Sequence, residues 1–175
     1  MYYLNGRGSL SRLTTVSFDD GTYTGTLDIA RTSVSLTSTS KDASKVTLSG
    51  DVTISYANTA GCSYLTFAGG LTIQDSIRCT VEHCTVTGPS RIAVALQRNV
   101  SAYMNAVAAT RTGGVGDVFS IANTANVGIN NCSATGYSTS GGAAFAIGGC
   151  NYVTFTGTTT ARTSAYAVYM NNSFI

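Results

Sequence analysis

The chain has 175 residues, of which 43% are hydrophobic and 10% are charged, and ten basic and eight acidic residues leave a formal net charge of +2. Globular proteins usually carry about a quarter charged residues, so this chain is poor in charge. The absence of any Lys or Arg run argues against electrostatic binding of nucleic acid. No apolar stretch reaches the roughly 18 residues of a helical span, which argues against membrane insertion.

The first 26 residues fit the pattern of the remaining chain poorly. We expect residues 1–26 to form an N-terminal cap or junction and residues 27–175 to form a single repetitive domain. The sequence ends at Met170–Ile175, inside what would be a further repeat. Because a bare end would expose strand edges, we expect the chain to be part of a longer chain or an assembly.

From residue 27 onward, short strands with an apolar-x-apolar core recur in two series. This alternation is typical of a strand with one buried face. Neighbouring members of the first series are 18 residues apart between Val34 and Val52 and 26 apart between Phe119 and Phe145. The first series starts at Val34, Val52, Leu71, Val94, Phe119, Phe145 and Val168, and the second at Leu27, Val46, Leu65, Val81, Val100, Val127 and Val153.

The repeat predicts an all-β solenoid. Strands that recur without helical periodicity between them cannot form βαβ units, so they wind as a coil that adds strands to parallel sheets. We therefore predict a parallel β-helix of about 6–7 coils of 18–26 residues, with the differences in length placed in loops. Gly pairs such as Gly69-Gly70 and Gly113-Gly114 mark these loops.

Several phrases resemble the opening and the coil repeats of a known family. They are Gly21–Ile29, Val34–Ser38, Asn99–Ser101, Asn126–Cys132 and Asn151–Phe155. They are similar to pectin-lyase-like right-handed parallel β-helices, as found in phage tail fibre and tailspike proteins. The resemblance covers roughly residues 20–175 and implies a right-handed coil. The family includes lyases, esterases, hydrolases, epimerases and viral fibres, so the fold does not select a function.

A closer resemblance concerns one acid. The phrase Gly116–Asn123 is similar to the segment that carries the nucleophilic Asp of pectin methylesterases, which makes Asp117 a weak catalytic candidate. That family has a Trp after the phrase, whereas this chain has none. We therefore leave enzymatic activity open, favour a protein without it, and assign no firm catalytic residue.

The segment Cys79–Cys84 contains thiols and the chain's one imidazole, which are zinc ligands elsewhere. On a strand, Cys79 and His83 are about 13 Å apart and Cys84 points to the opposite face. We expect no metal and no cofactor, His83 pointing into the core, and the five cysteines as free, partly buried thiols.

The outward positions of the first series are small and almost uncharged: Ser35, Thr53, Thr72, Ala95, Ser120, Ala146 and Tyr169. Interfaces are depleted of charge at their centre, so this face predicts burial against identical chains in a homotrimer. An ice-binding plane would require stricter coil lengths.

These observations favour a structural or host-recognition segment of a viral tail fibre or tailspike, on the virion or another extracellular surface. Its partners would be copies of itself and a cell-surface polysaccharide, with glycan contacts from exposed turns at Tyr103, Arg111, Tyr137 and Tyr166. Two further functions stay open. One is a carbohydrate-active enzyme of the same fold, and the other is a surface adhesin or ice-binding solenoid.

Overall fold

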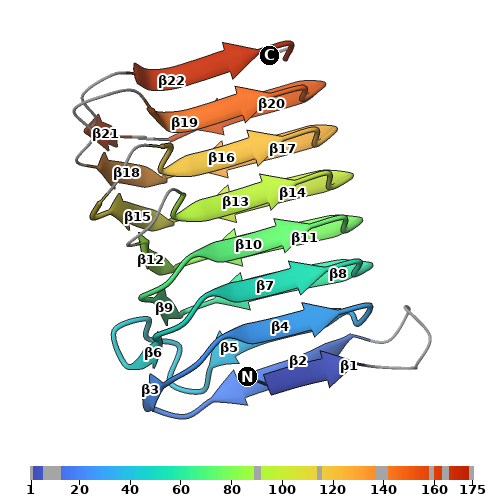
Figure 1. Ribbon diagram of the computed structural model, residues 1–175, viewed down its shortest axis with the longest axis vertical. Helices are drawn as coiled ribbons and strands as arrows, with labels where there is room; N and C mark the ends of the chain where they lie inside the picture. The colour runs from blue at the N-terminus through green and yellow to red at the C-terminus, as the bar shows by residue number, and fades with distance from the viewer. Residues whose placement is uncertain are drawn as a thin grey trace.

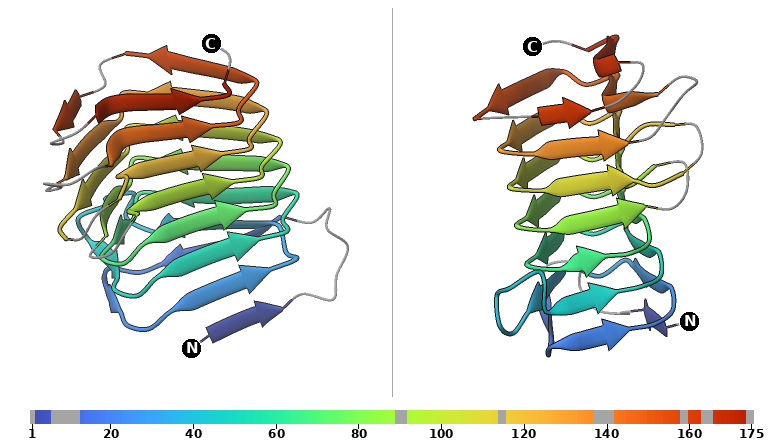
Figure 2. Two further views of the ribbon diagram at one scale, coloured as in Figure 1. Left: turned by 45° about the horizontal axis from the view of Figure 1, so that its top comes forward. Right: turned by 90° about the vertical axis from the view of Figure 1, so that its left-hand side faces the viewer.

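The structure is a computed structural model that describes residues 2–5, 13–88, 92–113, 116–136, 142–157, 160–162 and 166–173. Within these ranges the backbone forms strands and no helix, and the strands pair in parallel into three sheets. Every turn of the chain adds one strand to each sheet, so the coils stack along one axis (Figure 1). The predicted parallel β-helix is confirmed, and its coil is right-handed (Figure 2).

The three sheets are named in the order in which the chain enters them. Sheet A contains β1 (Tyr2–Asn5), β4 (Leu27–Ala30), β7 (Val52–Ser55), β10 (Leu71–Gln74), β13 (Val94–Gln97), β16 (Phe119–Ala122), β19 (Ala143–Gly148) and β22 (Tyr166–Asn171). Sheet B contains β2 (Thr14–Phe18), β5 (Val34–Ser38), β8 (Thr59–Ser63), β11 (Arg78–Glu82), β14 (Ser101–Asn105), β17 (Asn126–Asn130) and β20 (Tyr152–Thr156). Sheet C contains β3 (Gly21–Tyr23), β6 (Val46–Leu48), β9 (Thr66–Phe67), β12 (Thr85–Gly88), β15 (Ala108–Arg111), β18 (Ser133–Gly136) and β21 (Thr160–Arg162).

Each coil thus has three strands, and the expectation of two was wrong. Val34 belongs to sheet B, where it pairs with Ala60, whereas Leu27 is the residue of that coil that aligns with Val52 in sheet A. The second sequence series mixed strands of all three sheets: Leu27 lies in sheet A, Val46 in sheet C and Val81 in sheet B. The strands of sheet C are short, and several carry Ala at inward positions, as Ala109 and Ala134 do, which hides the apolar-x-apolar pattern.

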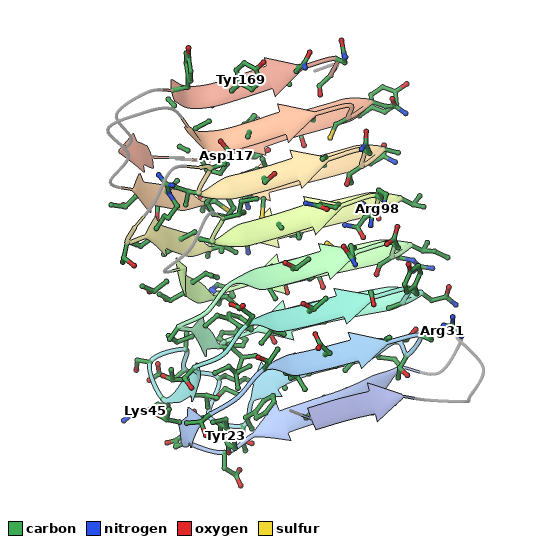
Figure 3. The ribbon with its side chains drawn as sticks, viewed as in Figure 1. Tyr23, Arg31, Lys45, Arg98, Asp117 and Tyr169 are labelled. Carbon is green, nitrogen blue, oxygen red and sulfur yellow. The ribbon has the colours of Figure 1, made fainter. Side chains whose placement is uncertain are left out.

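The A–B turn, which joins sheet A to sheet B, is built in the same way on successive coils. It begins with a residue of positive φ: Arg31, Tyr56, Asp75, Arg98, Asn123, Gly149 and Asn172. Figure 3 shows Arg31 and Arg98 at this edge, whereas Asp117, Tyr23 and Lys45 lie toward the opposite edge. In sequence, these positions carry few of the Gly residues that a positive φ favours.

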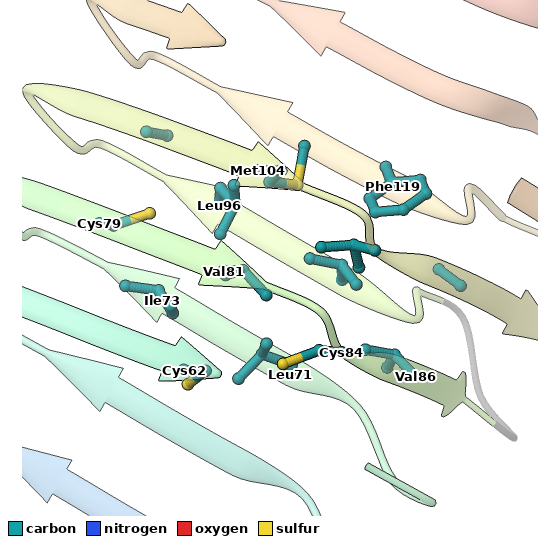
Figure 4. Packing of buried hydrophobic residues seen from close by; sticks show 14 of the residues in the cluster. Cys62, Leu71, Ile73, Cys79, Val81, Cys84, Val86, Leu96, Met104 and Phe119 are labelled. Atoms are coloured by element: carbon teal, nitrogen blue, oxygen red, sulfur yellow. The ribbon is translucent and has the colours of Figure 1, made fainter. Parts of the chain in front are cut away.

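The core lies between the three sheets and consists of apolar side chains in columns parallel to the axis (Figure 4). Parallel pairing sets Leu71 between Val52 and Val94, so like side chains pack on one another from coil to coil. The rings of Phe119 and Phe145 stack with centroids 4.7 Å apart. Each fully buried apolar side chain of this kind contributes about 1.5–3 kcal/mol, which makes the core the main source of stability.

The cysteines are part of this core. All five are free, as expected from the sequence, and they are fully buried where partial burial was expected. The thiols of Cys84 and Cys132 donate to the backbone oxygens of Glu82 and Asn130, two residues earlier, at 3.2 and 3.3 Å. Burial raises the pKa of the Cys84 thiol to about 12, so it is neutral at physiological pH.

His83 does not point inward, and that prediction was wrong. It is the positive-φ residue of the turn between β11 and β12, its side chain is exposed, and its ring stacks on Tyr64 of the preceding coil at 4.9 Å. The error followed from placing His83 in a strand column with Phe67. Within the described ranges no group of three His, Cys, Asp or Glu side chains is arranged to hold a metal.

The N-terminal strands extend the same sheets. β1 pairs with β4, β2 with β5 and β3 with β6. The division of the chain into a cap of residues 1–26 and a β-helix of residues 27–175 stays a prediction. Among the described residues, no helix has the length and apolar character needed to cross a membrane.

Candidate functional site

An open depression of about 330 Å³ lies on the outer face of sheet B, across β11, β14, β17 and β20. Two columns of outward side chains run through it along the solenoid axis. One column consists of Arg78, Ser101, Asn126 and Tyr152, and the other of Thr80, Tyr103, Gly128 and Thr154. Because parallel pairing fixes both columns, their spacing is set by the backbone at about 4.8 Å per coil.

Tyr103 is the central side chain of this depression. It points outward from the middle of β14 with an exposed fraction of 41%. Its ring occupies the space above Gly128, where an added Cβ would lie 2.9 Å from the ring atom Cδ2. A side chain at position 128 would therefore displace the ring. Glycine on β17 lets the Tyr103 ring lie close to the sheet.

Arg78 and Tyr152 lie at opposite ends of the first column. Three strand steps separate them, or roughly 14 Å along the axis. Both side chains are exposed, Tyr152 with a fraction of 67%. The depression therefore has a cationic end, an aromatic centre and a second aromatic end.

The remaining side chains of the depression are short and polar. The Ser101 hydroxyl donates to the backbone oxygen of Ile77, and the Thr154 hydroxyl donates to that of Val127, both at 3.3 Å. Each hydroxyl oxygen keeps lone pairs for a further donor. Asn126, which is exposed between Ser101 and Tyr152, adds an amide that both donates and accepts.

A second depression, of about 280 Å³, lies where the chain enters sheet A near the C-terminus. It is lined by Asp117, Gly142, Ala143, Ala146, Tyr166 and Tyr169. The Tyr166 and Tyr169 ring centroids are 6.0 Å apart. Sequence reasoning did not group Asp117 with Tyr166, but the fold brings them to one surface.

The carboxylate of Asp117 binds the next coil. Its Oδ1 accepts a hydrogen bond from the backbone N–H of Ala143 at 2.8 Å, as Oδ1 of Asp51 does from Gly70 at 2.8 Å. The two acids follow sheet C at comparable turns and fulfil the same structural role. Within the lining of the second depression Asp117 is the single acid, whereas glycoside hydrolysis usually requires a carboxyl pair.

The four residues expected to contact glycan differ in where they lie in the structure. Tyr103 and Tyr166 are exposed, but they lie on strands and not on turns. Tyr137 lies outside the described residues. The expectation that Arg111 is an exposed turn residue was wrong, because it is the last residue of β15 with an exposed fraction of 1%. Its side chain packs beside Gly136 of the next coil, on the inward side of sheet C.

Sequence reasoning missed Arg78 and Tyr152. Both stand one strand position before the apolar residue that marks β11 and β20, at Cys79 and Val153. Aligning the second series by sheet B alone places Arg78, Ser101, Asn126 and Tyr152 in one column. The sequence alone allows this alignment. It was missed because the second series combined strands that belong to different sheets.

No family model matches the chain, and no match was found among curated proteins or solved structures. The geometry of the parallel β-solenoid and of its two depressions is therefore the basis for inferring a function.

Proposed function

We propose that the protein is a glycan-recognition solenoid, acting as a structural or host-recognition segment of a viral tail fibre or tailspike. The observation that carries the proposal is the depression on sheet B, with Tyr103 at its centre and Arg78 and Tyr152 at its ends. Sugar rings present C–H faces that pack on aromatic rings, while hydroxyl, amide and guanidinium groups bind sugar oxygens. The long, open form suits a chain of sugars more than an enclosed small molecule.

The rigid support of these side chains favours recognition. Arg78 and Tyr103 project from strands paired on both sides, and Tyr152 projects from β20, which is paired with β17, so little ordering is required when a ligand binds. A bacterial surface adhesin would use the same depression and would differ in where the protein is displayed. Virion or extracellular display is part of the proposal.

Two observations argue against a carbohydrate-active enzyme and against an ice-binding solenoid. The carboxylate of Asp117 is engaged by the backbone of Ala143, which favours a structural role over catalysis. On sheet C, the Thr66 hydroxyl donates to the backbone oxygen of Ala43 at 2.7 Å, so the segment before β6 contacts the column of Thr residues there. An ice-binding plane needs such hydroxyls free to order water.

We also propose that copies of the chain associate through sheet A into a homotrimer. Between Asp28 and Tyr169, the central outer column of this sheet has no charge and no large side chain: it consists of Thr53, Thr72, Ala95, Ser120 and Ala146. Such a surface allows close approach of a second chain. Sedimentation equilibrium is expected to give three times the 18.0 kDa chain mass, and Thr72→Arg is expected to give monomers. A wild-type monomer would refute this assembly.

The glycan proposal is tested by binding to a panel of bacterial capsular and O-antigen polysaccharides, measured by calorimetry or biolayer interferometry. We expect wild-type protein to bind at least one member and Tyr103→Ala or Tyr152→Ala to weaken that binding at least tenfold, or about 1.4 kcal/mol. Tyr56→Asn is the matched control, because Tyr56 is an exposed tyrosine on the A–B turn, and it should bind normally. Undiminished binding by both depression variants would refute this site.

A further inference from the structure

Arg78 gives the sheet B depression a positive charge that no lining residue balances. The residues around the depression include no Asp or Glu. Asp75, three residues before Arg78, is paired with Arg98 through contacts of 2.7 and 2.8 Å. Glu82 lies four residues further along β11, or roughly 13 Å away along the strand. Arg78 thus lines the depression, and within the described part of the chain its guanidinium has no carboxylate as an ion-pair partner.

The position of this charge relative to the aromatic centre is fixed by the sheet. Arg78 pairs with Ser101 on β14, and Tyr103 stands two residues beyond Ser101. The backbone positions of Arg78 and Tyr103 are thus diagonal neighbours, roughly 8 Å apart. A sugar packed on the Tyr103 ring would place a substituent at its rim within reach of the long arginine side chain.

Arginine selects particular substituents. Its planar guanidinium matches the two oxygens of a carboxylate in a bidentate pair, and such charge-assisted hydrogen bonds are stronger than those to neutral hydroxyls. The overall charge of the chain, +2, adds little long-range attraction, so selection has to occur at the contact itself.

We propose that the sheet B depression recognises an acidic glycan, with the ring of a carboxylate-bearing sugar on Tyr103 and its carboxylate on the guanidinium of Arg78. This inference rests on the proposed glycan recognition and narrows it to uronic-acid-type ligands. Gly128 has a specificity role in this arrangement, because it allows the Tyr103 ring the pose that sets the height of the sugar above the sheet.

The experiment uses a panel of carboxylated and neutral polysaccharides: polygalacturonate, alginate, hyaluronan, polysialic acid, dextran, mannan and galactan, together with acidic capsular polysaccharides. Each acidic member is also tested after its carboxyl groups have been reduced to alcohols. We expect the bound members to be acidic, and carboxyl reduction to weaken their binding about tenfold. Arg78→Gln should cause a similar loss, and Arg78→Lys should restore only part of the affinity.

Further measurements distinguish a direct contact between Arg78 and the sugar carboxylate from nonspecific electrostatic attraction. Raising the salt concentration should weaken wild-type binding more than binding by Arg78→Gln, because the screened contact is missing in the variant. Arg31→Gln, at an exposed arginine of the A–B turn two coils before Arg78 and outside the lining of the depression, should bind as the wild type does. Gly128→Ala should weaken binding while the unfolding midpoint changes little, because the displaced neighbour is a surface ring.

The outcomes distinguish the two proposals. Equal binding of neutral and acidic members, unaffected by Arg78→Gln but lost in Tyr103→Ala, would overturn the acidic specificity and leave glycan recognition intact. Acidic binding that Arg31→Gln weakens as much as Arg78→Gln would overturn the assigned contact. Failure to bind any polysaccharide in the panel would overturn both proposals.

Discussion

The A–B turn and the C–A turn, which joins sheet C to the next strand of sheet A, show two ways of closing a coil. The A–B spacing is constant from Val52 onward, since eight residues separate Val52 from Ala60, Leu71 from Cys79 and Phe119 from Val127. The coil before it is one residue shorter here, with seven residues from Leu27 to Val34. The C–A spacing varies from four residues, between Phe67 and Leu71, to eleven, between Ala134 and Phe145. From Val52 onward, most of the difference in coil length therefore lies at the C–A edge. The coil that begins at Leu27 instead gains its length between sheets B and C, where 14 residues separate Val34 from Leu48 and seven separate Ala60 from Phe67.

Hydrogen bonds explain the constant length of the A–B turn from Val52 onward. Asn99 is buried there: its Oδ1 accepts from the backbone N–H of Ser76 at 3.0 Å, and its Nδ2 donates to the backbone oxygen of Ile73 at 3.1 Å. The N–H of Asn99 in turn donates to Oγ1 of Thr124 on the next coil at 3.4 Å. The bonds run from coil to coil, and one added residue would break several of them.

The comparison shows which part of the solenoid holds recognition side chains at fixed positions. Arg78 and its column follow directly after the constant turn, so their placement is as regular as that turn. Early C–A turns are instead held by close glycine contacts, as between Gly69 and Gly50. Later ones accept insertions, and Asp117 and Tyr166 lie beside them.

The largest expected effect comes from adding a residue to the constant turn. A glycine inserted after Arg98 should lower the free energy of unfolding by about 3 kcal/mol or more, because Asn99 loses its place between Ser76 and Thr124. A glycine inserted after Thr112, in a long C–A turn, should cost less than about 1 kcal/mol. Urea unfolding measures both, and similar losses would contradict the contrast between the turns.

Asn99→Ala should destabilise the protein by about 2–3 kcal/mol, because it leaves the buried N–H of Ser76 and the oxygen of Ile73 without the side chain that binds them. Amide exchange at Ser76 should increase together with the loss in urea. Thr112→Ala, at an exposed C–A position, is the control and should be nearly neutral. Unchanged amide exchange at Ser76 would show that the coil-to-coil hydrogen bonds of Asn99 contribute little to stability.

A smaller effect is expected at the glycine contacts. The Cβ of Gly69→Ala would lie 2.6 Å from the backbone carbon of Gly50, so the two coils must move apart locally. We expect a loss of roughly 1–3 kcal/mol, measured by thermal unfolding. Full wild-type stability would mean that the early C–A turns are looser than the glycine spacing indicates.

The smallest effect concerns the ion pair of the A–B turn. Hydrogen bonding to the Arg98 guanidinium holds the pKa of the Asp75 carboxyl below its usual value. The contribution to stability is therefore present above the unfolded-state pKa, about 3.9, and is lost as pH falls through the lower folded-state pKa. NMR titration of Arg98→Gln should show the Asp75 pKa rising, with little change in stability because the Arg98 side chain is exposed and Asp75 is partly so. An unchanged Asp75 pKa would contradict the pairing.

The fold was more predictable from the sequence than the site. Alternation around Leu71, Val94 and Phe119 specified inward columns directly, because a strand exposes every second residue. The third sheet was missed because its strands are short and partly built from Ala. Because of that error, the residues of sheet B were aligned incorrectly. His83 was assigned to the core, and Arg78 was not recognised as a site residue.

Arg111 illustrates what sequence could not supply. A charged residue before a Gly pair is typical of an exposed turn, whereas the fold buries its side chain beside Gly136. Burial of this kind depends on the neighbouring coil, which the local sequence does not reveal. Tyr103, in contrast, was recognised by its chemistry, although not by its place on β14.

A crystal structure of the protein with the polysaccharide fragment that it binds most tightly tests the central claim most directly. We predict sugar density along sheet B from Arg78 to Tyr152, with one ring on Tyr103 and an acidic group at the guanidinium. Sugar bound only at the C–A edge beside Asp117 and Tyr166, with sheet B bare, would contradict the assignment of the recognition surface.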